Sequence, residues 1–137
     1  MKEQYVTFET AKLLKEKGFG WFTYSYYTKD DVDTKPYFGI ENLCPDNWNG
    51  EVDEVNDLWF SAPTQQMACR WLREEKGIHI CTVPDLSSDK FYVSIAVNVN
   101  GKWRLHANFP APLLDEKYIK CEEAVEAALE YCLTNLI

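Results

Sequence analysis

The sequence predicts an α+β fold, with a single mostly antiparallel sheet covered on one face by helices and the element order αββαβββα. Three segments, near the start, the middle and the end of the chain, repeat apolar residues at helical spacing. The segments between them alternate apolar and polar residues with a period of two and are joined by polar turns, which is typical of hairpins. Helices and strands do not alternate regularly, as a parallel sheet would require, so an antiparallel sheet is favoured.

The first helix is expected over Thr7–Lys17, with its first residue as N-cap and the glycine that follows it as the stop. The next segment, "WFTYSYYT" at Trp21–Thr28, is dense in aromatic and β-branched residues and is expected to be a strand. A polar turn over 29–36 then leads to a second strand, "YFGIEN", at Tyr37–Asn42. These two strands are predicted to form a hairpin.

A long loop is expected over Leu43–Asp57, which Trp48 fastens to the body of the protein. The middle helix is predicted to begin at Ser61 as N-cap, with Pro63 in its first turn, and to end at Gly77. Its apolar stripe consists of Met67, Ala68, Trp71 and Leu72. This segment is therefore interpreted as scaffold and not as a site.

Three strands and a closing helix are expected in the remainder of the chain. The first strand is Ile78–Val83, and the second is Lys90–Val99, whose alternate residues form one apolar face. Asn100-Gly101 is a type I′ turn signal that leads into the third strand, "KWRLHANF". The helix Cys121–Leu136 carries an apolar stripe that would pack on the sheet.

Bulk composition favours one domain over residues 1–137. A chain of 137 residues with 46% hydrophobic content can bury one substantial core without stabilising disulfides or metal ions. Its N-terminal segment lacks the apolar region of a signal peptide, and no apolar run is long enough to span a bilayer, so we expect no membrane association. Five cysteines, an odd number without a CxxC pair, indicate free thiols and a cytoplasmic location.

The net charge of −8 makes nucleic acid an unlikely partner, because the average field repels phosphates. An acidic protein can still mimic nucleic acid, and this hypothesis remains an alternative. It requires the carboxylates to line up at phosphate-like spacing on one face.

Catalytic chemistry is weakly indicated. His79 and Cys81 stand two residues apart on an expected strand and would share a face, and His106 on the next hairpin could join them. An enzyme or small-ligand binder that uses these three residues and the aromatic sheet face is therefore an alternative. The closely spaced Cys and His pairs of ordinary zinc sites are absent, so we expect no metal and no cofactor.

The aromatic residues suggest an interaction surface. Five Trp, eight Tyr and seven Phe are more than one small core is expected to bury completely. One face of an antiparallel sheet is often open to water, and exposed aromatic side chains are enriched at protein interfaces. The expected interaction face consists of Trp21, Tyr24, Tyr26 and Tyr27. Its partner would be a second copy of the chain or an unidentified protein.

Three phrases, "YVTFETAKLLKEKGF", "SAPTQQMACRWLREEKGI" and "EEAVEAALEYCLTNLI", resemble a family of small uncharacterised proteins of gut bacteria and of their phages or other mobile elements. The resemblance covers most of the chain. It implies an accessory protein of mobile-element origin, and it implies no reaction and no site residues. Together with the aromatic content, it leads us to expect a non-catalytic protein-interaction module.

Overall fold

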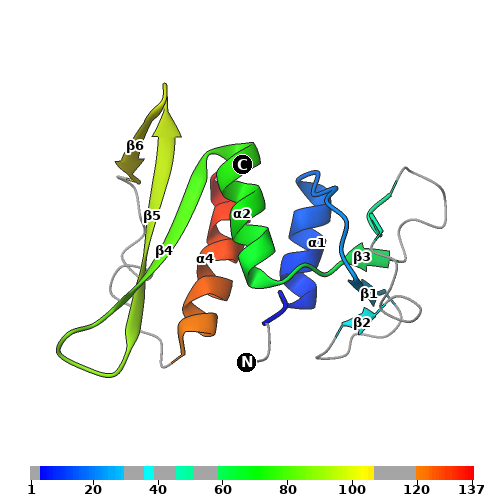
Figure 1. Cartoon of the computed structure of the whole chain (residues 1–137), viewed down its shortest axis with the longest axis horizontal. Helices are drawn as coiled ribbons and strands as arrows, with labels where there is room; N and C mark the ends of the chain where they lie inside the picture. The colour runs from blue at the N-terminus through cyan, green and yellow to red at the C-terminus, as the bar shows by residue number, and fades with distance from the viewer. Residues whose placement is uncertain (1–3, 30–35, 39–45, 51–58, 107–119) are drawn as a thin grey trace. The chain divides into compact units, whose positions relative to one another are not determined.

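The structure is a computed structural model of the whole chain, which describes residues 4–29, 36–38, 46–50, 59–106 and 120–137 (Figure 1). The described elements follow in the order α1 (Phe8–Glu16), β1 (Ser25–Thr28), β2 (Tyr37–Phe38), β3 (Trp59–Ser61), α2 (Gln65–Lys76), β4 (Ile78–Pro84), β5 (Phe91–Val99), β6 (Lys102–Leu105) and α4 (Cys121–Asn135). The α+β class is confirmed. The chain divides into two compact units, Met1–Gln66 and Met67–Ile137, and the division falls inside α2. A single domain over 1–137 stays a prediction.

The expected single sheet differs from the structure, because the described strands form two antiparallel sheets of three strands each. One has the order β2-β1-β3 and the other β4-β5-β6. The first sheet gains a strand that the sequence did not suggest, since Ser61 lies opposite Tyr26 at the end of β3. Ser61 is therefore a strand residue and not the N-cap of α2. Backbone pairing with β1 takes precedence there over the capping preference of serine.

Helix α1 begins and ends as predicted. The Thr7 side chain accepts a hydrogen bond from the backbone N–H three residues further on, at 3.3 Å. At the other end Gly18 has a φ of +90°, and its N–H donates to the Lys15 carbonyl at 3.2 Å. The Phe19 N–H donates to the Leu14 carbonyl at 2.9 Å, which completes a Schellman motif. This turn directs the chain from the helix toward β1.

In the unit Met1–Gln66, buried and more exposed side chains alternate along the segment that leads into β1 and along β1 itself. Thr23, Ser25 and Tyr27 are buried, whereas Phe22 and Tyr24 are exposed. Helix α1 packs on β3 in the same unit. The buried apolar residues of this unit include Val6, Ala11, Leu14, Phe19 and Tyr27. One face of the first sheet is thus turned inward, and the other is open.

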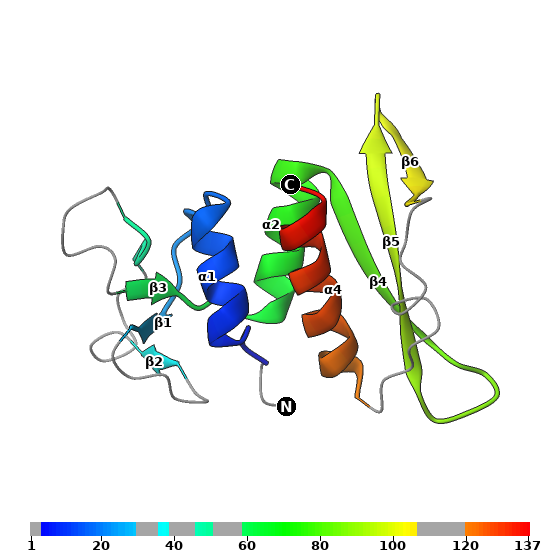
Figure 2. The same cartoon turned by 180° about the vertical axis from the view of Figure 1, so that it is seen from behind.

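In the unit Met67–Ile137, α4 packs on β4 and β5, and α2 and α4 lie side by side in both views (Figures 1 and 2). The buried sheet residues are Ile78, Ile80, Val93 and Ile95, and the buried helix residues include Ala68, Trp71, Leu72, Leu129 and Leu133. Trp71 is only 3% exposed, which confirms the prediction that it belongs to the scaffold. The type I′ turn is also confirmed, since Asn100 and Gly101 have φ values of 54° and 82°.

Candidate functional site

The outer face of the first sheet carries six aromatic side chains, which we call the open aromatic face: Phe22, Tyr24, Tyr26, Tyr37, Trp48 and Trp59. Tyr26 lies opposite Tyr37 on the neighbouring strand, and Trp59 lies opposite Thr28. Because alternate strand residues share a face, these side chains lie on the same side of the sheet. Phe22 and Tyr24 continue the alternation before β1, and both side chains are exposed.

Four of these rings form a contiguous cluster. The Tyr26 and Trp48 centroids are 4.3 Å apart, and the two rings are tilted against each other by 31°. The Trp59 ring lies 5.6 Å from both of them, and the Tyr37 ring lies 6.0 Å from Tyr26. The cluster is only partly covered, since Trp59 remains 42% exposed and Tyr37 39%. Its rings are thus held by one another and still present area to solvent.

The segment 46–50 fixes Trp48 in this cluster. The indole Nε1 of Trp48 donates to the Thr23 carbonyl at 2.8 Å, and the backbone beside it pairs with Thr23 in both directions. The Asn49 side chain donates to the Phe19 carbonyl and accepts from the Ser61 N–H, each at 2.9 Å. The prediction that Trp48 fastens the loop is confirmed for this described part. The rest of the expected loop Leu43–Asp57 lies outside the described residues.

Two of the four residues of the predicted interaction face lie on the open aromatic face, and the role of this face in binding stays a prediction. Tyr24, at 50% exposure, and the half-buried Tyr26 belong to the open aromatic face. Tyr27 does not, because it points to the other side of β1, is 2% exposed and donates its hydroxyl to the Val6 carbonyl at 2.6 Å. Trp21 shares the parity of Tyr27 and lies half-buried, with its ring 6.3 Å from that of Phe19. A twofold strand period cannot place adjacent residues such as Tyr26 and Tyr27 on one face.

Sequence reasoning missed the remaining members of the face. Tyr37 was placed on the correct strand, but its partner across the hairpin was not assigned. Trp59 lies in a three-residue strand that is too short to show a period. Trp48 reaches the sheet from irregular backbone, for which only the aromatic character of the residue gives a signal.

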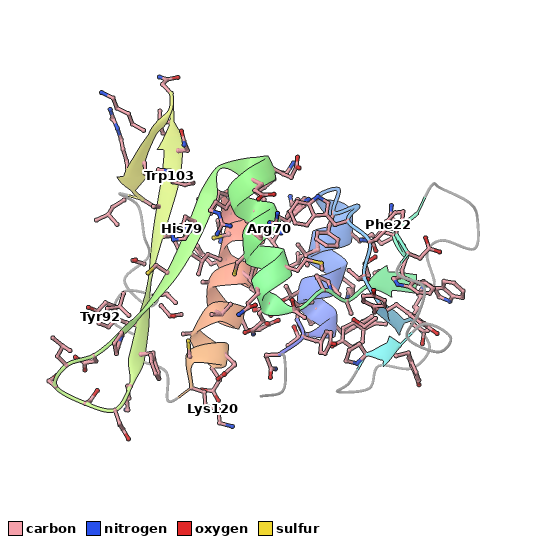
Figure 3. All side chains as sticks on the ribbon, viewed as in Figure 1. Phe22, Arg70, His79, Tyr92, Trp103 and Lys120 are labelled. Atoms are coloured by element: carbon pink, nitrogen blue, oxygen red, sulfur yellow. The ribbon has the colours of Figure 1, made fainter. Side chains whose placement is uncertain are left out.

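His79, Cys81 and His106 do not come together. His79 and Cys81 alternate with the buried Ile78 and Ile80, so they lie on the face of the second sheet that is turned away from α4. There the His79 ring meets Trp103 edge-on at 6.0 Å (Figure 3). His106 lies on the helix side, where its Nε2 is 3.1 Å from the Tyr131 hydroxyl of α4. The enzyme or ligand site built on these three residues is therefore not supported.

The described thiols are all free: Cys69, Cys81, Cys121 and Cys132. Burial, with a contribution from nearby Glu126, raises the pKa of the Cys69 thiol to about 12. Burial and the neighbouring Cys69 raise the pKa of Cys132 to about 12 as well. Since the thiolate is the reactive form, these two cysteines are inert packing residues. Within the described ranges no group of three His, Cys, Asp or Glu side chains is placed to hold a metal ion.

The nucleic-acid-mimic hypothesis requires the carboxylates to line up on one face, and many of them, including those of the segments 30–35 and 51–58, lie outside the described residues, so it stays a prediction. Among the described helices, none has the length and apolar character needed to cross a membrane. In comparisons with protein-family models, curated proteins and solved structures, the chain matches none of them.

Proposed function

We propose that this protein is a non-catalytic accessory protein of mobile-element origin, acting in the cytoplasm as an interaction module that binds a partner protein through the open aromatic face. The observation that carries the proposal is the cluster of ring contacts among Tyr26, Tyr37, Trp48 and Trp59, with Phe22 and Tyr24 beside it. Exposed large aromatic residues gathered on one sheet face are typical of interaction surfaces. The free thiols of the described residues support a reducing compartment.

The ordering of the face favours binding. Immobilising a side chain at an interface costs about 0.5–1.5 kcal/mol in lost rotamer freedom. The rings of Tyr26, Trp48 and Trp59 already constrain one another, and Trp48 is also hydrogen-bonded to the backbone. A partner that covers these rings therefore gains apolar contact at a small additional entropic cost.

Charge indicates the chemistry of the partner. The unit Met1–Gln66 contains six lysines, no arginine and twelve acidic residues, a formal net charge of −6. The faces of Trp and Tyr rings attract cations, and arginine stacks well on them. We infer that the partner presents a basic, arginine-containing segment to the open aromatic face. A second copy would bring a like charge to the same surface, so self-association is the less favoured occupant.

The test measures binding of two synthetic peptides of equal length, one an alternating Arg-Gly repeat and one an alternating Glu-Gly repeat, by calorimetry. Saturable binding of the basic peptide alone is expected, with affinity that falls between 50 and 200 mM salt. The double variant Tyr24→Ser/Trp59→Ser should weaken binding at least tenfold. Trp103→Ser is the matched control, because Trp103 is also exposed, at 47%, but lies in the other sheet.

Two outcomes would contradict the proposal. Equal loss of binding in the Trp103→Ser control would show that the peptide does not select the open aromatic face. A concentration-dependent dimer in light scattering that the Tyr24→Ser/Trp59→Ser variant abolishes would make a second copy of the chain the occupant, against the charge argument.

A further inference from the structure

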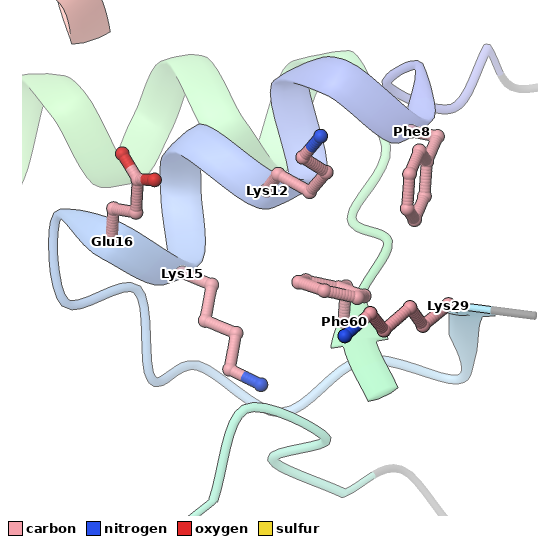
Figure 4. A pocket seen from close by; sticks show the side chains of 6 residues that line it. All are labelled: Phe8, Lys12, Lys15, Glu16, Lys29 and Phe60. Carbon is pink, nitrogen blue, oxygen red and sulfur yellow. The ribbon is translucent and has the colours of Figure 1, made fainter. Parts of the chain in front are cut away.

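A concave feature lies in the unit Met1–Gln66, on the side of β3 that bears Phe60. It is a cavity of about 510 Å³ lined by Phe8, Lys12, Lys15, Glu16, Lys29 and Phe60 (Figure 4). Small-molecule sites have volumes of this order. Since Trp59 and Phe60 are consecutive strand residues, β3 directs one ring to the open aromatic face and the next ring to this cavity.

The charge of the cavity is opposite to that of the unit around it. Three of the unit's six lysines line it, against one acid, Glu16, although the unit as a whole has a formal charge of −6. On α1, Lys12 and Lys15 are three residues apart and so lie on one side of the helix. Lys29 is the residue that directly follows β1, and Figure 4 shows its side chain reaching toward the Phe60 ring. A local positive potential at this point favours an anionic ligand.

The lysines are arranged around two phenylalanine rings. Phe8 and Phe60 meet edge-to-face, with centroids 5.3 Å apart and an interplanar angle of 82°. The Lys15 Nζ lies 4.7 Å from the Phe60 centroid and donates to the Trp59 carbonyl at 2.9 Å, which fixes its position. The Lys12 Nζ lies 5.3 Å from the Phe8 centroid. Apolar ring surface and ammonium groups therefore occur within one small volume.

We propose that this cavity binds a small organic anion that combines a planar apolar group with a carboxylate. The apolar group packs on Phe8 and Phe60, and the carboxylate accepts hydrogen bonds from the ammonium groups of Lys12 and Lys29. Lys12 also pairs with Glu9 at 3.4 Å on the exposed surface, a contact of low strength that a ligand carboxylate can replace. Glu16 disfavours a second anionic group on the ligand.

The probe is 2-naphthoate, and its charge-reversed analogue is 2-naphthylmethylammonium. Saturation-transfer NMR and calorimetry on the full chain should show saturable binding of naphthoate and none of the ammonium compound. Lys12→Gln/Lys29→Gln should weaken naphthoate at least fivefold. Lys17→Gln is the control for charge, because it removes the same charge from the end of α1 without lining the cavity. Phe60→Leu tests the apolar contact and should also weaken binding severalfold.

Equal affinity for the two probes would overturn the proposal, as would naphthoate binding that is unchanged in the double lysine variant. Circular dichroism of each variant distinguishes a lost site from a lost fold, and Lys12→Arg/Lys29→Arg should restore binding if charge is the determinant. The proposal is independent of the partner-binding function. If Tyr24→Ser/Trp59→Ser abolishes naphthoate binding, the probe occupies the open aromatic face and the cavity is refuted as its site.

Discussion

Tyr27→Phe removes a single oxygen from the interior of the unit Met1–Gln66. The Tyr27 hydroxyl donates to the Val6 carbonyl at 2.6 Å, and both residues are buried. A typical hydrogen bond contributes about 1 kcal/mol net, and a buried acceptor left without its partner costs about 1–3 kcal/mol. The phenylalanine ring keeps the edge-to-face contact with Phe8 at 5.7 Å, so little packing is lost. We expect the free energy of unfolding to fall by about 1.5 kcal/mol.

Urea unfolding followed by far-ultraviolet circular dichroism measures this change. With an m-value of about 2 kcal/mol/M, the midpoint should fall by about 0.8 M. Tyr24→Phe is the matched control, because it removes the same oxygen from a residue that is 50% exposed, and it should change stability by less than about 0.5 kcal/mol. The assignment of these two tyrosines to opposite faces would be falsified if the two variants were equally stable, or if Tyr24→Phe were the more damaging change.

Three further predictions concern buried groups. Burial raises the pKa of Cys132 to about 12, above the ordinary 9.0, so this thiol should resist Ellman's reagent at pH 8 while the exposed Cys81 reacts. The contribution of Cys132 to stability should decline as pH rises from about 9 toward 12, and urea titrations over this pH range would measure the decline. Ser61→Ala should leave the free energy of unfolding unchanged or raise it, since the buried Ser61 hydroxyl has no hydrogen-bond partner among the described residues. Ser25→Ala should lower the free energy of unfolding by about 1–2 kcal/mol, because the buried Ser25 hydroxyl donates to a backbone carbonyl. Equal denaturation midpoints for the two variants would contradict this prediction. Trp71→Ala should cost about 3 kcal/mol or more, and an unchanged midpoint would show that the side chain is not part of the core.

Local signals in the sequence predicted the elements that local chemistry determines. Thr7 and Gly18 delimit α1, and Asn100-Gly101 forms the expected turn, because each of these depends on residues within a few positions. The apolar stripe of the last helix is buried as its spacing indicated. These predictions needed no knowledge of distant contacts.

The pairing of β1 with β3 could not be predicted in the same way. Tyr26 meets Ser61 across a long stretch of chain, and three residues of β3 carry no recognisable period. For the same reason, the alternation from Trp21 to Thr28 defined two faces but did not say which of them is buried. Of the residues expected on one face, Tyr24 and Tyr26 therefore lie on the open side of the sheet and Tyr27 lies on the buried side. Long-range strand pairing determines both which strand lies beside β1 and which face of β1 is buried, and a single sequence gives little indication of such pairing.

The close packing of Trp48 and Trp59 with Tyr26 has an optical consequence. Aromatic rings whose centroids lie 4.3–5.6 Å apart in a fixed, asymmetric arrangement couple electronically and give near-ultraviolet circular dichroism. Trp59 is partly exposed, so its emission also responds to the polarity of whatever covers it. The near-ultraviolet circular dichroism and tryptophan emission thus report on the open aromatic face directly, and an occupant of that face can be detected on the unlabelled protein.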